Sequence, residues 1–224
     1  MFWHLGKPET LNGFGVRRVD LHKIKRQSSI AVLDDEPFVR TEQLRTHEFQ
    51  ITELGGDIKS VSQIESYPVV ICDVRGVGRS FGSAAEGAHV LSEIKKAYPD
   101  KYLIAYTGMT YSLAITEKLA EAADKIMPKD APIDAWVQLL ETALYEISDP
   151  RRRWVRLRST LLDKNVDIFD VLKLEQAYVK AIKQATPELL SGKAKTLALS
   201  DEAKELVVKF AAAALVQLIE SLAH

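Results

Sequence analysis

The sequence predicts an α/β protein, with a doubly wound parallel sheet of five strands followed by an all-helical region. Between residues 29 and 148, short apolar segments alternate with segments of helical periodicity about five times. The apolar segments are almost continuously hydrophobic, which is typical of parallel strands that are covered on both faces. From residue 149 onward only helical periodicity is found, so the change of domain is expected near this residue.

Five segments are assigned to strands, and a helical segment follows each of them. The predicted strands are SIAVL (29–33), FQITEL (49–54), PVVICD (68–73), KYLIAYTG (101–108) and DKIMPK (124–129). The predicted helices are residues 37–46, 60–66, 88–99, 111–123 and 132–147. Few residues separate the first and third strands, so we expect the first helix to be truncated.

The N-terminal extension, residues 1–28, is punctuated by glycine and proline, and we expect a strand or a hairpin arm at residues 16–24. The α/β domain is predicted at residues 29–148. A helical domain at residues 149–224 is predicted to serve output or dimerisation. Its first helix begins at Asp149-Pro150, because aspartate favours the N-cap and proline the first helical position.

Further helices are predicted at residues 167–184 and after Ser200, and Pro187 and Gly192 interrupt the pattern between them. The last helix has an apolar face wider than one neighbouring helix requires. Two interpretations remain open for this face. It forms a homodimer interface, or it packs onto residues 150–184 of the same chain.

The composition indicates a folded chain without a global electrostatic preference for nucleic acid or membranes. The chain has 224 residues, 46% of them hydrophobic, with 30 Lys+Arg against 31 Asp+Glu. Its single cysteine, Cys72, excludes an internal disulfide and a cysteine-based zinc site. The N-terminus does not resemble a signal peptide, and no uncharged apolar run has the length of a membrane span. We therefore expect a soluble cytoplasmic protein.

Two motifs, an arginine run and a glycine-rich segment, each allow a structural and a functional interpretation. The run Arg151-Arg152-Arg153 is expected on a solvated helix face, because no second basic cluster or winged-helix pattern supports DNA binding. Phosphate-backbone or membrane binding is the less favoured interpretation. The glycine-rich segment GVGRSFG (76–82) lacks the GxGxxG spacing of a dinucleotide loop. A flexible lid over a site, or a docking loop for a partner, is favoured there.

Polar residues follow the ends of the predicted strands. Asp34-Asp35, Asp73, Thr107 and Lys129 stand at four of these ends. The carboxyl ends of parallel strands form the ligand-binding edge of such a sheet, so we expect these side chains to converge. The carboxylates suit Mg²⁺, which prefers oxygen ligands. Asp73 is placed to attack phosphorus, while Lys129 and Thr107 can bind phosphoryl oxygens.

The segments VLDDEP, VVICDVRG, EGAHVLSEIKKAYP, LIAYTG and MPKD occur in this order, and together they resemble the response-regulator receiver domain of two-component signalling. The resemblance covers about residues 29–148 and implies a flavodoxin-like receiver fold. It implies that Asp73 is the phosphoacceptor, that Thr107 provides the switch hydroxyl, and that Lys129 is the lysine characteristic of the family's site. The implied Mg²⁺ ligands are Asp34, Asp35, Asp73 and the backbone carbonyl of Arg75.

Three features depart from the family pattern. The loop after Asp73 is longer and richer in glycine, and it contains Arg75 and Arg79. Ile126 stands where the family usually has an aromatic switch residue. Asp130 follows the lysine where proline is typical, and Pro128 precedes it. The first two departures bear on how a signal propagates, and the chemistry of the site is retained.

The resemblance implies a response regulator in which a histidine kinase or phosphotransfer protein phosphorylates Asp73 with Mg²⁺ bound. The modification would switch protein–protein contacts of the helical domain. The alternative is a phosphorylation-independent interaction or scaffold module, motivated by Ile126 and Asp130. We expect no enzyme activity beyond receiver-type self-phosphorylation and dephosphorylation. A phosphatase-like enzyme is disfavoured, because no acid/base beyond the metal-binding pair is evident near Asp73.

Overall fold

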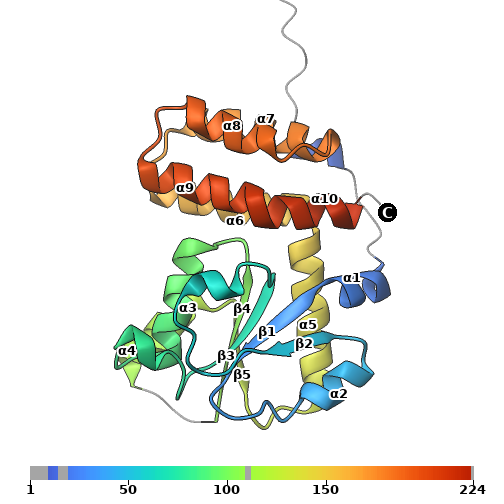
Figure 1. The fold of residues 1–224 in the computed structure, drawn as a ribbon, viewed down its shortest axis with the longest axis vertical. Coiled ribbons are helices and arrows are strands. Elements are labelled where there is room, and N and C mark those ends of the chain that lie inside the picture. Colours follow the sequence, from blue (N-terminus) through green and yellow to red (C-terminus); the bar gives the residue numbers. More distant parts are fainter. Residues whose placement is uncertain (1–9, 15–19, 109–111, 223–224) are drawn as a thin grey trace, which may run out of the picture. The chain divides into compact units, whose positions relative to one another are not determined.

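Five parallel strands form one sheet in the first of two compact units, Val19–Ser148 (Figure 1). The computed structural model describes residues 10–14, 20–108 and 112–222. The strands are β1 (Ser29–Leu33), β2 (Gln50–Glu53), β3 (Val69–Asp73), β4 (Tyr102–Thr107) and β5 (Lys125–Pro128), in the order β2-β1-β3-β4-β5. The predicted five-stranded, doubly wound sheet is confirmed. Its winding direction reverses between β1 and β3, which is where ligands bind in such sheets.

The register of the central strands decides which strand ends become neighbours. Leu33 of β1 is paired with Cys72 of β3, so Asp34 leaves the sheet beside Asp73. Asp73 is in turn paired with Tyr106 of β4, one residue before Thr107. All five residues of β3 are buried, as the continuous apolar pattern predicted.

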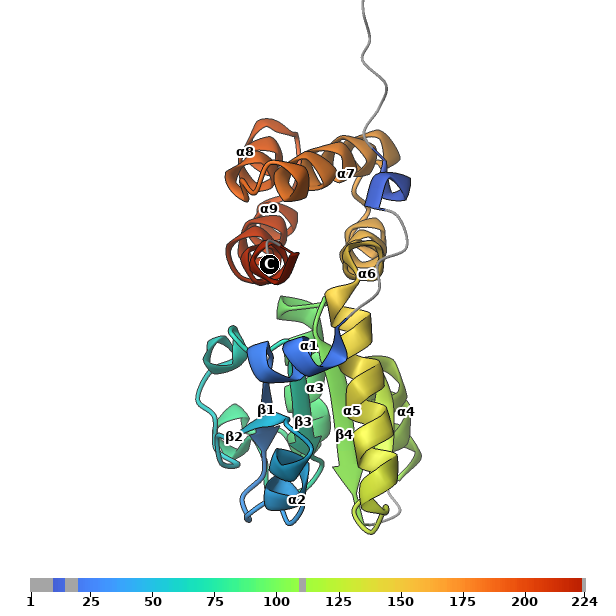
Figure 2. The same ribbon diagram turned by 90° about the vertical axis from the view of Figure 1, so that its right-hand side faces the viewer.

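One face of the sheet is covered by α1 (Leu21–Gln27), α2 (Thr41–Thr46) and α5 (Ile133–Ser148) (Figure 2). The truncated first helix is confirmed, since α2 has six residues. The expectation of a strand or hairpin in residues 16–24 is wrong at residues 20–24, where the N-cap Asp20 and the first turn of a helix are found. Residues 16–19 lie outside the described part of the chain. Asp20 caps this helix, α1, by accepting a hydrogen bond from the Lys23 backbone.

Helix α1 covers the part of the sheet face next to the short helix α2. Its Ile24 is buried in the same apolar cluster as the inward residues of α2 and α5. The Lys25 ammonium lies 2.7 Å from the Glu141 carboxylate of α5 and 4.5 Å above the Phe49 ring. The extension that we expected as one N-terminal piece is therefore divided, and its residues 20–28 belong to the sheet unit.

The other face is covered by α3 (Glu86–Ala97) and α4 (Leu113–Ala122), with the short turn η2 (Val61–Ile64). The prediction of a two-turn helix at residues 60–66 is wrong, because η2 is a single turn of 3-10 helix. Ser60 and Gln63 form a capping box that satisfies the backbone locally. Ile64 still buries its side chain against the sheet.

The second unit is helical over its described residues. It contains η1 (Leu11–Phe14), α6 (Pro150–Asp163), α7 (Ile168–Lys183), α8 (Glu188–Thr196), α9 (Asp201–Phe210), the π-helical segment η4 (Ala211–Leu215) and α10 (Val216–Leu222). The predicted caps are confirmed at Asp149 and Ser200, whose side chains accept backbone hydrogen bonds. The predicted interruption at Gly192 is wrong, because α8 continues through it.

An aromatic core holds this unit together. The rings of Trp154 and Tyr178 stack with centroids 5.0 Å apart, and Phe210 lies 5.9 Å from Tyr178. The indole nitrogen of Trp154 donates to Glu175 at 2.7 Å, and the Tyr178 hydroxyl donates to the Pro150 carbonyl at 2.8 Å. Both buried polar groups therefore have partners.

The wide apolar face of the C-terminal helix is buried within the same chain. Its members Val207, Phe210, Ala214, Leu215 and Leu218 all lie in the core of the helical unit. Of the two interpretations of this face, packing onto the helices of residues 150–184 is the one observed. Leu222, at the end of this face, is only partly buried against the same core.

The arginine run at the start of α6 is a solvated helix face only in part, because Arg152 is exposed whereas Arg153 is buried. Arg151 and Arg152 pair with the Asp149 carboxylate at 3.4 and 3.7 Å. Arg153 is buried, and its Nη1 donates to the Ala214 carbonyl at 2.9 Å. The acceptor lies in the π-helical segment η4, so Arg153 ties the start of α6 to this segment.

Candidate functional site

Three carboxylates meet at the carboxyl edge of the sheet. Asp34 and Asp35 follow β1, Asp73 ends β3, and one oxygen from each lies within 4.8 Å of the others. Asp34 and Asp73 are buried, whereas Asp35 is exposed. Buried carboxylates at this spacing repel each other unless a cation compensates them. The donor set consists of hard oxygen ligands with one side open to water, which fits Mg²⁺.

Lys129 is the cation closest to Asp73. Its Nζ lies 2.5 Å from Asp73 Oδ2, and the backbone N–H of Arg75 donates to Asp73 Oδ1 at 3.3 Å. Burial alone would lower the pKa of Lys129, but the hydrogen bond and the charge of Asp73 outweigh it, so this pKa is raised. The ammonium therefore stays charged and neutralises Asp73.

The surroundings of Asp34 disfavour its ionised form. Burial, and next the charge of Asp73, raise its pKa, although a hydrogen bond from the Glu36 backbone N–H at 3.0 Å acts in the opposite direction. A raised carboxyl pKa means that the ionised form is under-compensated in the absence of a metal ion.

The structure brings the other predicted residues to the same edge. Thr107 ends β4 beside the end of β3, and its carbonyl accepts the Lys129 backbone N–H at 2.9 Å. Arg75 lies two residues beyond Asp73, in the loop above the strand ends. All six predicted residues are therefore at one end of the sheet.

The glycine-rich loop after β3 is tied to the loop after β2. Gly78 N–H donates to the Gly56 carbonyl at 2.7 Å. Ser80 donates from both its backbone and its hydroxyl to Asp57 Oδ1, at 3.0 and 2.7 Å. These hydrogen bonds anchor the loop, and its role as a flexible lid or as a docking loop stays a prediction.

Two sets of side-chain contacts near the site were not predicted from the sequence. Arg79 Nη2 lies 3.1 Å from Asp35 Oδ2. The rings of Phe38, Tyr106 and Trp136 form a buried edge-to-face cluster with centroids 5.2 to 6.0 Å apart. Lys129 Nζ lies 5.0 Å from the Tyr106 centroid. The continuous apolar run of β4 could have indicated that Tyr106 is buried, whereas its contacts with Phe38 and Trp136 require the tertiary structure.

Ile126 does not substitute for an aromatic residue in this cluster. It is 39% exposed on β5, while the buried aromatic group next to Lys129 comes from β4. The position on β5 where an aromatic residue was expected is therefore aliphatic, and the aromatic ring next to Lys129 is that of Tyr106 on β4.

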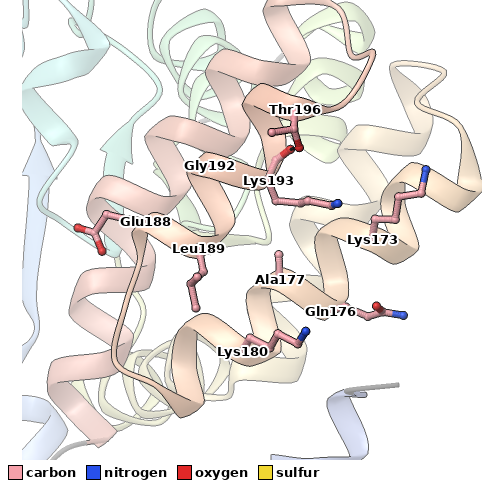
Figure 3. Close-up of a pocket in the computed structure, with 9 residues that line it drawn as sticks. All are labelled: Lys173, Gln176, Ala177, Lys180, Glu188, Leu189, Gly192, Lys193 and Thr196. Atoms are coloured by element: carbon pink, nitrogen blue, oxygen red, sulfur yellow. Dashed lines mark hydrogen bonds between the residues drawn. The ribbon is translucent and has the colours of Figure 1, made fainter. Parts of the chain in front are cut away.

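One groove of the helical unit lies between α7 and α8 (Figure 3). It has a volume of about 510 Å³ and is lined by Lys173, Gln176, Ala177, Lys180, Glu188, Leu189, Gly192, Lys193 and Thr196. Three of these residues are lysines, and no arrangement of acid, base and nucleophile is present among the lining residues.

The strand order, the flanking helices and the acidic strand ends define a flavodoxin-like fold of the receiver type, followed by an all-helical region. No protein-family model and no curated protein matches this sequence. No described helix has both the length and the apolar character needed to cross a bilayer.

Solved structures similar to this chain include several receiver domains. A CheY-like receiver domain protein from Methanospirillum hungatei is 17% identical over 53% of this chain and 94% of its own, with a TM-score of 0.44. The receiver domain of Nitrogen Regulatory Protein C is 22% identical over 54% and 96%, with a TM-score of 0.45. A Burkholderia pseudomallei response regulator is 14% identical over 74% and 97%, with a TM-score of 0.41.

Proposed function

We propose that this chain is a phosphoacceptor response regulator, phosphorylated on Asp73 in a Mg²⁺-dependent reaction. The observation that supports the proposal most directly is the Lys129–Asp73 ion pair at 2.5 Å, set among three carboxylates within 4.8 Å. A histidine kinase or phosphotransfer protein would supply the phosphoryl group. No enzyme activity beyond receiver-type self-phosphorylation and dephosphorylation is proposed.

The chain's own residues suit an in-line transfer. An Asp73 oxygen attacks the phosphorus of the donor, a new P–O bond forms, and the bond to the donor's leaving group breaks. Asp34, Asp35, Asp73 and the Arg75 carbonyl would hold Mg²⁺, which supplies neutralisation of phosphoryl charge when bound. Once Asp73 carries the phosphoryl group as an acyl phosphate, Lys129 loses its carboxylate partner and can pair with a phosphoryl oxygen.

Thr107 is proposed as the hydroxyl that responds to the phosphoryl group. It adjoins Tyr106, whose ring contacts Phe38 and Trp136. A movement at Thr107 would therefore be transmitted to a buried aromatic cluster next to α5. We propose that this changes protein–protein contacts of the helical region, including homodimerisation through surfaces other than the covered α9–α10 face.

The proposal includes a cytoplasmic location. The only cysteine, Cys72, is a buried free thiol, as expected for a chain that folds without disulfides in a reducing compartment.

The test is intact mass spectrometry after incubation with Mg²⁺ and acetyl phosphate. We expect the wild type to gain one phosphoryl group, and neither Asp73→Ala nor the isosteric Asp73→Asn to gain any. A wild type that stays unmodified, and that also shows no Mg²⁺-dependent response to beryllofluoride, would refute the proposal.

A second candidate is a phosphorylation-independent interaction module, favoured by the exposed Ile126 in place of the usual aromatic switch. It predicts that Asp73→Ala leaves the binding of a partner unchanged. A changed partner affinity in this variant would exclude it.

A further inference from the structure

Arg79 forms the outermost contact of the acidic site. Its guanidinium lies 3.1 Å from Asp35 Oδ2, with the two side chains 73% and 39% exposed. Asp35 is also the outermost of the three carboxylates, since Asp34 and Asp73 are buried. Lys129 forms an ion pair with Asp73, and Arg79 forms an ion pair with Asp35. Two of the three carboxylates therefore have a cationic partner.

The backbone on both sides of Arg79 is held in place. Gly78 is hydrogen-bonded to Gly56, and Ser80 is bonded twice to Asp57. An exposed ion pair between free side chains is usually weak, because both side chains lose conformational freedom. The hydrogen bonds at residues 78 and 80 fix the position of the backbone from which the Arg79 side chain reaches Asp35.

The same two loops enclose Asp35 from both sides. A β-carbon at Gly76 would lie 2.3 Å from both carboxylate oxygens of Asp35, and one at Gly56 would lie 2.8 Å from its Cβ. The carboxylate is therefore confined between the glycine-rich loop and the loop after β2. One of its remaining contacts is Arg79.

We propose that Arg79 is a built-in competitor of the divalent cation at Asp35. The inference rests on the proposed function, which places Mg²⁺ on Asp34, Asp35 and Asp73. A guanidinium and a divalent cation attract the same carboxylate and repel each other. Metal binding must therefore displace Arg79 or proceed against its charge, which weakens the apparent affinity and raises the Mg²⁺ concentration at which the site fills.

The test measures Mg²⁺ affinity directly, by calorimetric titration of the full chain, with Mn²⁺ titration by electron paramagnetic resonance as a second readout. Arg79→Gln removes the charge and keeps most of the side chain. We expect it to bind either ion about three- to ten-fold more tightly than the wild type. Arg79→Lys keeps the charge and should stay near the wild-type affinity.

Two further variants separate local contact from net charge and backbone anchoring. Lys59→Ala removes one exposed positive charge from the neighbouring loop, and no change of affinity is expected. Asp57→Ala releases Ser80, so its affinity should lie between the wild type and Arg79→Gln. The double variant Asp57→Ala/Arg79→Gln should match Arg79→Gln alone, because the anchor acts only through Arg79.

The outcomes distinguish this inference from the proposed function. An Arg79→Gln affinity equal to or weaker than that of the wild type overturns the inference, even where the wild type is phosphorylated normally. Equal tightening by Lys59→Ala also overturns it, because net charge would then suffice. Binding by Arg79→Gln alone supports the inference and contradicts the proposed function of the wild type. Absence of binding in both proteins overturns both.

Discussion

Gly76 faces the carboxylate of Asp35 so closely that a β-carbon at this position would lie 2.3 Å from both oxygens. Its φ of +72° lies in the left-handed region, where a side chain is strained even in open space. Glycine is therefore required at this position for two reasons, the positive φ of the turn and the close approach of the Asp35 carboxylate.

We predict that Gly76→Ala lowers both the stability and the Mg²⁺ affinity. Gly55→Ala is the matched control, because its φ of +76° is similar and a β-carbon there meets nothing within 4 Å. Both variants should lose about 1 kcal/mol of unfolding free energy from backbone strain. Only Gly76→Ala should also displace Asp35 and weaken Mg²⁺ binding, measured by calorimetry. Equal affinities in the two variants would contradict this.

Removal of the Lys129 ammonium should destabilise the fold and prevent phosphorylation. Lys129→Met leaves the buried Asp73 carboxylate without its 2.5 Å partner. Because Lys129 is 38% exposed, we expect a modest loss of about 1–2 kcal/mol in urea unfolding. Lys125→Met changes an exposed position of β5. We expect its unfolding free energy and its phosphorylation to equal those of the wild type.

Asp34→Asn should stabilise the metal-free protein at neutral pH. Burial raises the pKa of Asp34 above its unfolded value, so the folded state holds this proton more tightly. The folded state then loses stability as the pH rises from the unfolded pKa, about 4, through the folded pKa. The asparagine variant lacks this loss.

Urea midpoints measured between pH 4 and 8 in the presence of a chelator test this prediction. The advantage of Asp34→Asn over the wild type should grow with pH, and saturating Mg²⁺ should reduce it by stabilising the wild type. Asp130→Asn, on the exposed loop after β5, should follow the wild-type curve. A constant difference across the pH range would refute the electrostatic explanation.

Within the arginine run, only Arg153 is expected to be essential for stability. Arg153→Ala removes a buried donor to the Ala214 carbonyl and leaves a cavity, so we expect a loss of about 2–4 kcal/mol. Arg152→Ala, with a side chain 46% exposed, should change the unfolding free energy by less than about 0.5 kcal/mol. Thermal unfolding of both variants provides the comparison.

The strands and most of the site could be predicted because their signals are local. Continuous apolar segments mark buried parallel strands, and the polar residue after each segment falls at the carboxyl edge whatever the details of packing. The two predicted N-caps, Asp149 and Ser200, depend on a single turn of chain and were equally accessible.

The missed features depend on contacts between residues that are distant in sequence. Residues 21–27 have little helical periodicity of their own, and α1 is stabilised by packing on α5. The pairing of Arg79 with Asp35 spans 44 positions. Gly192 discouraged a helix at residues 188–196 through its propensity, but burial of Leu190 and Ala194 outweighs that cost.

The reactivity of the Cys72 thiol can be used to measure local unfolding of the sheet unit. The thiol is fully buried, its Sγ lies 3.2 Å from the Asp73 carbonyl, and burial raises its pKa well above the usual range. Since thiolates rather than thiols react with disulfide reagents, labelling of this single cysteine must wait until β3 separates from α3. The labelling rate therefore measures how often the strand that ends in Asp73 is exposed, without any introduced probe.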